Sequence, residues 1–345
     1  MSSTQINIKP NILSELLATR DWLLADGATG TTLFNMGLQS GDAPELWNLE
    51  HRDQIIALYK GAVDAGSDIF LTNTFGANAS RLKLHNIENK VHEINKVAAE
   101  IARDVADQSG RKVAVAGCVG PTGEIMAPLG ALDYTRAVEM FHEQAEGLKV
   151  GGADVLWCET ISAGEEFKAA AEAFALADMP WCGTMSFDTA GRTMMGLTSA
   201  ELTKLVSKLP NQPIAFGANC GVGASDLLRT ILGFRATVPK KPIIAKGNAG
   251  IPKYVEGQIH YDGTPDLMAD YACLARNSGA TIIGGCCGTT PEHLRAMRVA
   301  LETRSRDLAP TLETITSALG GFSSLSDGTD GAGPVRAPRH GRIRS

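Results

Sequence analysis

Eight short apolar runs, each followed by a segment with helical spacing, restrict the folds that this sequence can adopt. The runs are continuously apolar instead of alternating with polar residues, as expected for parallel strands that are covered on both faces. Eight strand–helix units over about 280 residues predict a (β/α)₈ barrel, and a doubly wound open sheet is the alternative. The predicted strands lie at 22–28, 69–72, 113–117, 154–159, 181–187, 214–219, 243–246 and 281–283.

Polar side chains stand at the carboxyl ends of these predicted strands. In a barrel the carboxyl ends of all eight strands meet at one mouth, so residues far apart in the sequence become neighbours there. This convergence favours the barrel over the open sheet and predicts one shared site. Its candidate residues are Asp26, Thr72, Glu159, Asn219, Cys220, Cys286 and Cys287.

Three cysteines in this set have the character of metal ligands. Cys286 and Cys287 are adjacent, and neighbouring cysteines rarely bridge each other because a disulfide strains that geometry. Cys220 ends another apolar strand and, like Cys287, precedes a glycine. Three cysteines bind zinc and leave one tetrahedral position open, as in a catalytic site. The alternative is that they are ordinary buried cysteines.

Composition excludes several other classes of function. The formal net charge is −6, which provides no basic surface for nucleic acid or anionic lipid. No apolar run is long enough to span a bilayer, and residues 1–10 lack the apolar segment of a secretory signal. Seven cysteines in a chain of this length do not suggest a disulfide framework. We therefore expect a cytoplasmic protein.

The organised part of the chain is predicted to end near residue 305. Residues 306–345 form a C-terminal extension, in which 311–319 can make one short helix. The sequence from Gly320 is rich in Gly, Ser and Pro and ends with several arginines, which is typical of a disordered basic tail. Such a tail could dock on a second subunit of a homo-oligomer or on an acidic partner, or it could be inert.

Several sequence blocks also resemble a known family. They are Asp26–Thr31 (DGATGT), Leu71–Phe75 (LTNTF), Gly117–Pro121 (GCVGP), Glu159–Thr160, Asn219–Cys220, Asn248–Pro252 (NAGIP) and Gly284–Thr289 (GGCCGT). In this order they resemble the homocysteine S-methyltransferase family, which includes betaine–homocysteine methyltransferase and the homocysteine module of cobalamin-dependent methionine synthase. The resemblance covers about residues 15 to 305 and is strongest in the Asn-Cys and Gly-Gly-Cys-Cys-Gly blocks.

The resemblance implies a zinc-dependent barrel in which Cys220, Cys286 and Cys287 hold the metal and the homocysteine sulfur takes the open position. It further implies that Asp26 and Glu159 hold the substrate's amino group, and that Gly27 with Thr72 holds its carboxylate. We expect Asn219, beside Cys220, to orient a thiolate ligand, although a role in a turn is an alternative.

A three-cysteine site suits the activation of a thiol. An alkyl thiol has a pKa near about 8.5 and is mostly protonated at neutral pH, whereas the thiolate is the nucleophile. Coordination to a divalent cation deprotonates the thiol. Three cysteinates leave the metal a weak Lewis acid, so the bound sulfur keeps its electron density and can attack a methyl group.

The methyl donor is harder to infer. An onium donor such as glycine betaine calls for aromatic faces around the cation, and the animal betaine enzymes carry aromatics where this chain has Gly76 and Thr160. The overall pattern, including the block at 188–196, looks most like bacterial proteins assigned to betaine, and several blocks also resemble the methionine-synthase module. Candidate donor-pocket aromatics are Trp47, Phe75, Trp157, Phe187, Tyr254 and Tyr261.

Three hypotheses follow for a methyltransferase-like chain of this kind. The first is a self-contained transferase that converts homocysteine and betaine to methionine and dimethylglycine. The second is the homocysteine-activating subunit of a split methionine synthase, which takes the methyl group from a separate methyl-corrinoid protein. The third is a zinc-binding or thiol-binding protein without enzymatic activity.

Overall fold

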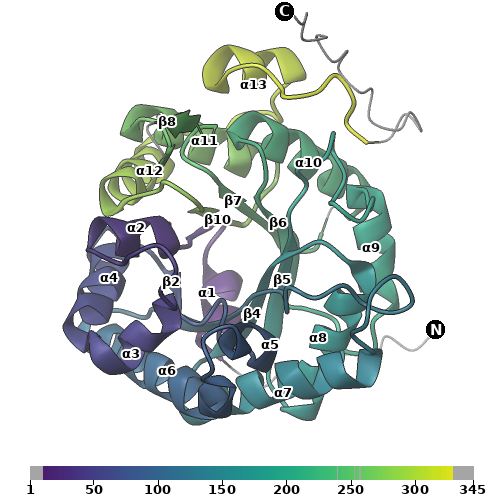
Figure 1. The fold of residues 1–345 in the computed structure, drawn as a ribbon. Coiled ribbons are helices and arrows are strands. Elements are labelled where there is room, and N and C mark those ends of the chain that lie inside the picture. Colours follow the sequence, from purple (N-terminus) through teal and green to yellow (C-terminus); the bar gives the residue numbers. More distant parts are fainter. Residues whose placement is uncertain (1–10, 239, 252, 256–257, 329–345) are drawn as a thin grey trace, which may run out of the picture.

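The eight predicted strands form one parallel sheet that curls into a nearly closed barrel (Figure 1). The computed structural model describes residues 11–238, 240–251, 253–255 and 258–328, with side chains described outside 253–259. The barrel confirms the predicted fold and excludes the open doubly wound sheet. Its strands are β1 (Leu23–Leu24), β2 (Ile69–Leu71), β3 (Ala114–Val119), β4 (Val155–Ile161), β5 (Trp181–Met185), β6 (Ala215–Cys220), β7 (Ile243–Gly247) and β10 (Ile282–Gly285).

The strand order around the sheet is β1-β10-β7-β6-β5-β4-β3-β2, so β1 and β2 are the two edges. Side chains join these edges where the strands do not pair directly. Asp68 Oδ2 accepts a hydrogen bond from Leu24 N at 3.0 Å, and Asp26 Oδ2 accepts one from Leu71 N at 2.7 Å. Together with the backbone hydrogen bond from Asp68 N to Leu24 O at 2.6 Å, these two aspartate side chains complete the ring.

Helices surround the ring of strands on the outside (Figure 1). Some helices begin with a capping side chain: Asp133 Oδ1 accepts from Arg136 N at 2.8 Å, and Thr198 Oγ1 accepts from Glu201 N at 3.2 Å. The helices are α1 (Ile12–Thr19), α2 (Gly30–Asn35), α3 (Trp47–Glu50), α4 (Arg52–Asp64), α5 (Ala79–Lys83), α6 (Val91–Gln108), α7 (Tyr134–Val150), α8 (Gly164–Leu176), α9 (Ser199–Lys208), α10 (Ala224–Thr237), α11 (Pro265–Asn277), α12 (Pro291–Thr303) and α13 (Leu312–Leu319).

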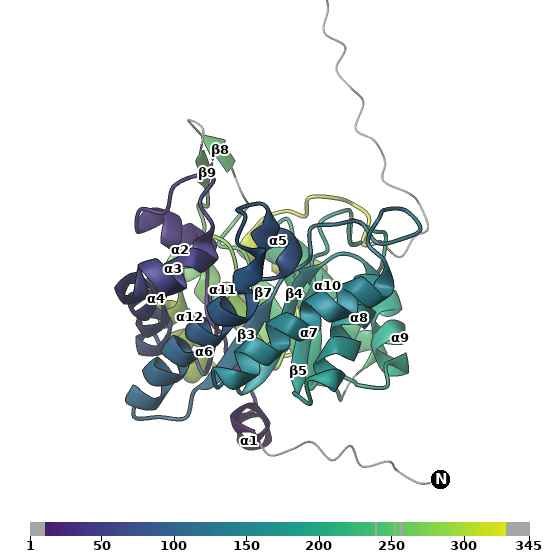
Figure 2. The same cartoon turned by 60° about the horizontal axis from the view of Figure 1, so that its bottom comes forward.

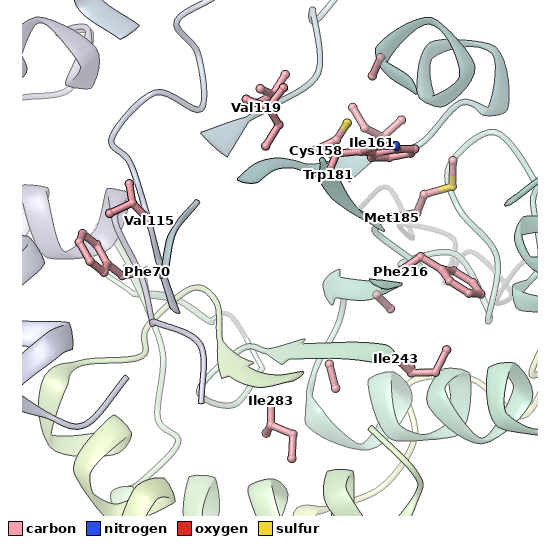
Figure 3. Packing of buried hydrophobic residues seen from close by; sticks show 14 of the residues in the cluster. Phe70, Val115, Val119, Cys158, Ile161, Trp181, Met185, Phe216, Ile243 and Ile283 are labelled. Carbon is pink, nitrogen blue, oxygen red and sulfur yellow. The ribbon is translucent and has the colours of Figure 1, made fainter. Parts of the chain in front are cut away.

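Two apolar layers hold the barrel together. The larger lies between strands and helices, where side chains such as Phe70, Phe216 and Ile283 point outward from the ring (Figure 3). The second fills the interior of the barrel and includes Trp157. Leu13 and Leu16 of α1 belong to this inner layer, so α1 closes one end of the barrel (Figure 2). The opposite end carries the carboxyl ends of the strands and remains available for a site.

Several elements at the open end were not predicted. They are α2, α3, α5 and a hairpin of β8 (Lys253–Val255) and β9 (Gln258–His260), which pair antiparallel. In Figure 2 these elements lie on the side opposite α1. No helix within the described part of the chain is both long enough and apolar enough to cross a membrane.

The first part of the C-terminal extension packs on the barrel. The predicted short helix is present as α13, which contacts α10 and α11. Beyond it, Asp226 and Arg229 of α10 form a buried ion pair at 3.0 Å that also binds the segment 320–328. Asp226 accepts from Ser323 N at 3.0 Å, and Arg229 donates to Ser324 O at 3.0 Å and lies over the Phe322 ring. Residues 329–345, the rest of the predicted tail, lie outside the described residues.

We expect Arg229→Ala to release residues 320–328 from α10. The substitution removes the hydrogen bond to Ser324 and the contact with Phe322, and leaves the buried Asp226 carboxylate without its cation. Loss of a buried charge pair costs about 2 kcal/mol or more, which predicts roughly 30-fold faster amide exchange in this segment. Hydrogen-exchange mass spectrometry measures it. Arg136→Ala, which breaks an exposed pair with Glu139, is the control and should change nothing.

Candidate active site

The three cysteines predicted to bind metal meet at one point. Cys220 is the last residue of β6, and Cys286 and Cys287 directly follow β10. Their three Sγ atoms lie within 4.8 Å of one another, and those of Cys220 and Cys287 are 3.9 Å apart. Around tetrahedral zinc, with Zn–S bonds of about 2.3 Å, two sulfurs lie about 3.8 Å apart. The donor set and its spacing therefore fit a zinc ion with a fourth position for a further ligand.

Backbone contacts fix the two cysteine loops relative to each other. Cys220 and Gly221 both have left-handed backbone angles, with φ of 60° and 74°. For a residue with a side chain this conformation costs about 1 kcal/mol or more and is typical of functional sites. Asn248, just beyond β7, donates to Gly221 O at 2.9 Å and accepts from Cys287 N at 3.1 Å. This one side chain thus joins the loop after β6 to the loop after β10.

The three thiols of the cluster differ in how readily each loses its proton. Hydrogen bonds from the Cys220 and Cys286 thiols lower the pKa of Cys287, and a hydrogen bond from Tyr261 lowers it further. The Tyr261 side chain packs against Gly288, where an added Cβ would come within 2.4 Å of the Tyr261 Cβ. The hydrogen bonds to the other two cysteines and burial raise the pKa of Cys220, so Cys287 is the thiol of the cluster that is favoured as a thiolate, and a cation would be attracted to it.

Asn219 connects the metal site to β4 and β5. Its Oδ1 accepts from Thr160 N at 2.9 Å and from Thr184 Oγ1 at 2.6 Å. Its Nδ2 donates to Thr160 Oγ1 at 2.7 Å and contacts Cys286 Sγ at 3.8 Å. Thr160 has a left-handed φ of 62°, so the amide of Asn219 secures a strained position. The sulfur that Asn219 contacts is that of Cys286 and not that of its sequence neighbour Cys220.

A buried lysine lies between the two predicted carboxylates. Lys246 of β7 donates to Asp26 Oδ1 at 2.8 Å, and its Nζ is 3.6 Å from Glu159 Oε2. Its side chain is 3% exposed, and Nζ lies 5.6 Å from the centre of the Trp157 ring. Burial alone lowers the pKa of Lys246, but Asp26 and Glu159 raise it well above its ordinary value. The lysine is therefore charged, and its single positive charge lies between the carboxylates of Asp26 and Glu159.

Glu159 keeps one oxygen without a hydrogen-bond donor. Its Oε1 accepts from Cys118 Sγ at 3.3 Å, while Oε2 is buried and has no hydrogen-bond partner among the described residues. Burial, together with the nearby Cys286 and Asp26, raises the pKa of Glu159 to about 7 against the opposing effect of Lys246. An unpaired buried carboxylate oxygen beside a metal site is suited to a cationic ligand group.

The other predicted substrate contacts lie on the same side but are engaged within the protein. Thr72 is buried, and its hydroxyl bonds to Thr74 Oγ1 at 2.6 Å and accepts from Cys118 N at 2.9 Å. Gly27 lies against Thr289, where a Cβ would come within 2.6 Å of the carbonyl oxygen. The structure therefore explains why glycine is needed at position 27, whatever it binds.

The candidate donor-pocket aromatics do not gather in one place. Trp47 and Phe187 lie in the outer core, where they pack on His51 and Phe234. Trp157 is inside the barrel, and Phe75 packs against the same inner layer while remaining partly exposed. Tyr261 lies next to the cysteines, and the side chain of Tyr254 is outside the described residues.

Sequence reasoning gave no role to Lys246 or Asn248. Lys246 ends an apolar strand run just as Asn219 does, and that shared position was the available signal. The remaining four cysteines are all buried and lie outside the sulfur cluster. They are Cys118, Cys158, Cys182 and Cys273.

Comparison with known proteins identifies the relatives of this chain. A family model described as Homocysteine S-methyltransferase matches residues 23–301. Methionine synthase of Mycobacterium tuberculosis is 30% identical over 302 residues, which cover 82% of this chain and 25% of that protein. The methionine synthase of Mycobacterium leprae is 30% identical over 307 residues, again with 25% of its length covered. The chain thus spans about a quarter of the length of these relatives.

Solved structures agree with the barrel fold. The metallated form of the homocysteine methyltransferase MmuM from Escherichia coli superposes with a TM-score of 0.70 and 24% identity. The alignment covers 84% of this chain and 99% of that one. The oxidised form of the same protein gives the same values. At this level of identity the likeness extends to the fold.

Proposed function

Because the chain belongs to the homocysteine S-methyltransferase family, we propose that it transfers a methyl group to the sulfur of homocysteine at its three-cysteine site. The observation that carries this proposal is the meeting of Cys220, Cys286 and Cys287 beside Glu159, whose Oε2 has no hydrogen-bond donor among the described residues. A thiol-binding position and an ammonium-binding position lie together there. Homocysteine carries both groups.

In this reaction the three cysteines would hold zinc, which when bound lowers the pKa of a coordinated thiol and keeps it a thiolate. Asn219 would hold Cys286 in position through its amide. Glu159 would accept the substrate's ammonium group on Oε2. The sulfur then forms a bond to the methyl carbon while the bond between that carbon and the donor breaks, and its electron pair leaves with the donor.

We propose an onium compound, with glycine betaine favoured, as the donor. The products would be methionine and dimethylglycine. Two partly exposed aromatics, Phe75 and Tyr261, support this proposal because aromatic faces stabilise an onium cation. The block at 188–196, which looks like that of bacterial proteins assigned to betaine, also supports it. A methyl-corrinoid protein as donor is the second candidate, and the similarity to methionine synthases favours it.

A panel of donors distinguishes the two candidates. Zinc-loaded protein and homocysteine are incubated with betaine, other onium compounds, S-methylmethionine or methylcobalamin, and methionine is quantified. Methionine from betaine alone supports the first candidate. Methionine that appears only when a methyl-corrinoid protein is added supports the second, and no methionine from any donor contradicts both.

Homocysteine affinity should also depend on pH through Glu159. The carboxyl group must be ionised to accept an ammonium group, and its pKa is raised to about 7. Its ionised fraction falls roughly tenfold between pH 8 and pH 6, and affinity should fall with it. Calorimetry with homocysteine and with 4-mercaptobutyrate, which lacks the amino group, isolates this effect as the ratio of the two affinities. A ratio that is constant across this range would contradict the assignment.

A further inference from the structure

We propose that Asp26 acts on Lys246 and not directly on the substrate. By holding the lysine away from Glu159, Asp26 leaves Glu159 as the acceptor of the substrate's ammonium group. This inference rests on the proposed function. It gives different roles to Asp26 and Glu159, which family resemblance alone would treat as equivalent ligands of the substrate's amino group.

Both carboxylate oxygens of Asp26 already have protein donors. Oδ2 accepts from Leu71 N at 2.7 Å, across the seam between the edge strands β1 and β2. Oδ1 accepts from Lys246 Nζ at 2.8 Å. The residue is 5% exposed. Asp26 therefore has a structural role in closing the barrel, and its charge is neutralised at hydrogen-bond distance.

Glu159 is in the opposite situation. Its Oε2 is buried without a hydrogen bond among the described residues, and Lys246 Nζ is 3.6 Å away, too far for a hydrogen bond. A shift of the lysine head by about 1 Å would bring it into hydrogen-bond range. In that position Lys246 would occupy the place that the proposed function gives to the substrate's ammonium group. Its hydrogen bond to Asp26 opposes this shift.

The charges of Asp26, Glu159 and Lys246 together also match one substrate ammonium group. With Glu159 ionised, the two carboxylates and one lysine leave a net charge of −1; Asp26 and Lys246 are buried, and the Glu159 side chain is 13% exposed. One substrate ammonium group cancels that charge, whereas a thiol without an amino group leaves it uncompensated. These three residues thus favour α-amino thiols over simple thiols. Lys246 is a positioning residue, because its positive charge reduces the net charge of the two carboxylates to −1.

A double-substitution experiment tests this inference by calorimetric binding of homocysteine to zinc-loaded protein, without any donor. Asp26→Asn keeps an acceptor for Leu71 N but loses the charge that holds the lysine. We expect homocysteine affinity to fall about tenfold or more, since hydrogen bonds to charged groups contribute about 1.5–3 kcal/mol. Adding Lys246→Met to Asp26→Asn should restore most of the loss. The same Lys246→Met substitution in the wild-type background should bring no gain.

Two binding results would contradict the inference, and a third would contradict the proposed function. If the double variant binds no better than Asp26→Asn, Asp26 contacts the substrate itself and the inference is wrong. It is also wrong if Lys246→Met tightens binding in both backgrounds alike. Wild-type zinc protein that does not bind homocysteine would instead contradict the proposed function. Zinc content and thermal unfolding verify each variant, and Lys246→Gln replaces Lys246→Met if the latter does not fold.

Discussion

Replacing Cys286 with alanine is expected to abolish both zinc binding and methyl transfer. Cys286 is one of three sulfurs within 4.8 Å of one another, and two remaining cysteines cannot complete the donor set of a three-cysteine site. Without metal, the substrate thiol keeps a pKa near about 8.5 and is mostly protonated at neutral pH. Because metal activation is worth several kcal/mol, we expect activity to fall about a thousandfold or more. Metal analysis and initial rates measure the two effects.

The same loss is expected for Cys220→Ala and Cys287→Ala, since each supplies one ligand. Cys273→Ala is the matched control. Cys273 is a buried cysteine in a small apolar cluster on α11 and α12, so its replacement should leave zinc content and rate unchanged. Full turnover by a triple variant that lacks Cys220, Cys286 and Cys287 and contains no zinc would refute the proposed mechanism.

The cysteine ligands could be predicted from the sequence because they depend on one simple relation. Each follows a recognisable apolar strand, and a parallel barrel brings the ends of its strands to one rim. The prediction did not need side-chain detail. Asn219 shows the limit of this reasoning, because a contact with a thiolate ligand was predicted from its place beside Cys220, whereas the sulfur that it contacts is that of Cys286. The alternating directions of side chains along β6 and β10 bring it to Cys286 instead of Cys220.

Lys246 could not be assigned a role in the same way. A lysine at the end of an apolar run is usually solvent-exposed, since burial of an unpaired charge is costly. Its partner Asp26 is 220 residues away in the sequence, and Glu159 comes from a third strand. The meeting of these charges depends on where β1, β4 and β7 stand around the barrel. Only the three-dimensional arrangement shows that a single lysine ammonium lies between two carboxylates.

The donor pocket was the least predictable part of the site. Aromatic residues serve equally well in an apolar core and around an onium cation, so residue type alone does not separate the two roles. Trp47 and Phe187 illustrate this, because both pack in the outer core. Tyr261 lies beside the cysteines because of the unpredicted β8–β9 hairpin region that precedes it.

Glu159→Gln is expected to separate substrate binding from metal binding. Glutamine keeps the size of the side chain and removes the charge that Oε2 would offer to an ammonium group. Loss of a charge-assisted hydrogen bond of about 1.5–3 kcal/mol should raise the KM for homocysteine roughly 10- to 100-fold. Zinc content should stay at the wild-type level, because Glu159 is not among the clustered metal ligands. The kcat at saturating homocysteine should change far less than the KM.

Steady-state kinetics in homocysteine at a fixed donor concentration, together with metal analysis, measure this split. Glu165→Gln is the control, since Glu165 is exposed on α8 and pairs with Lys168 at the surface. A fall in kcat without a change in KM would instead place Glu159 at the reacting atoms. Loss of zinc would place it in the metal site. Cysteine variants that lose metal and a Glu159 variant that keeps it would together show that thiol activation and amino-group recognition are separate functions of adjacent residues.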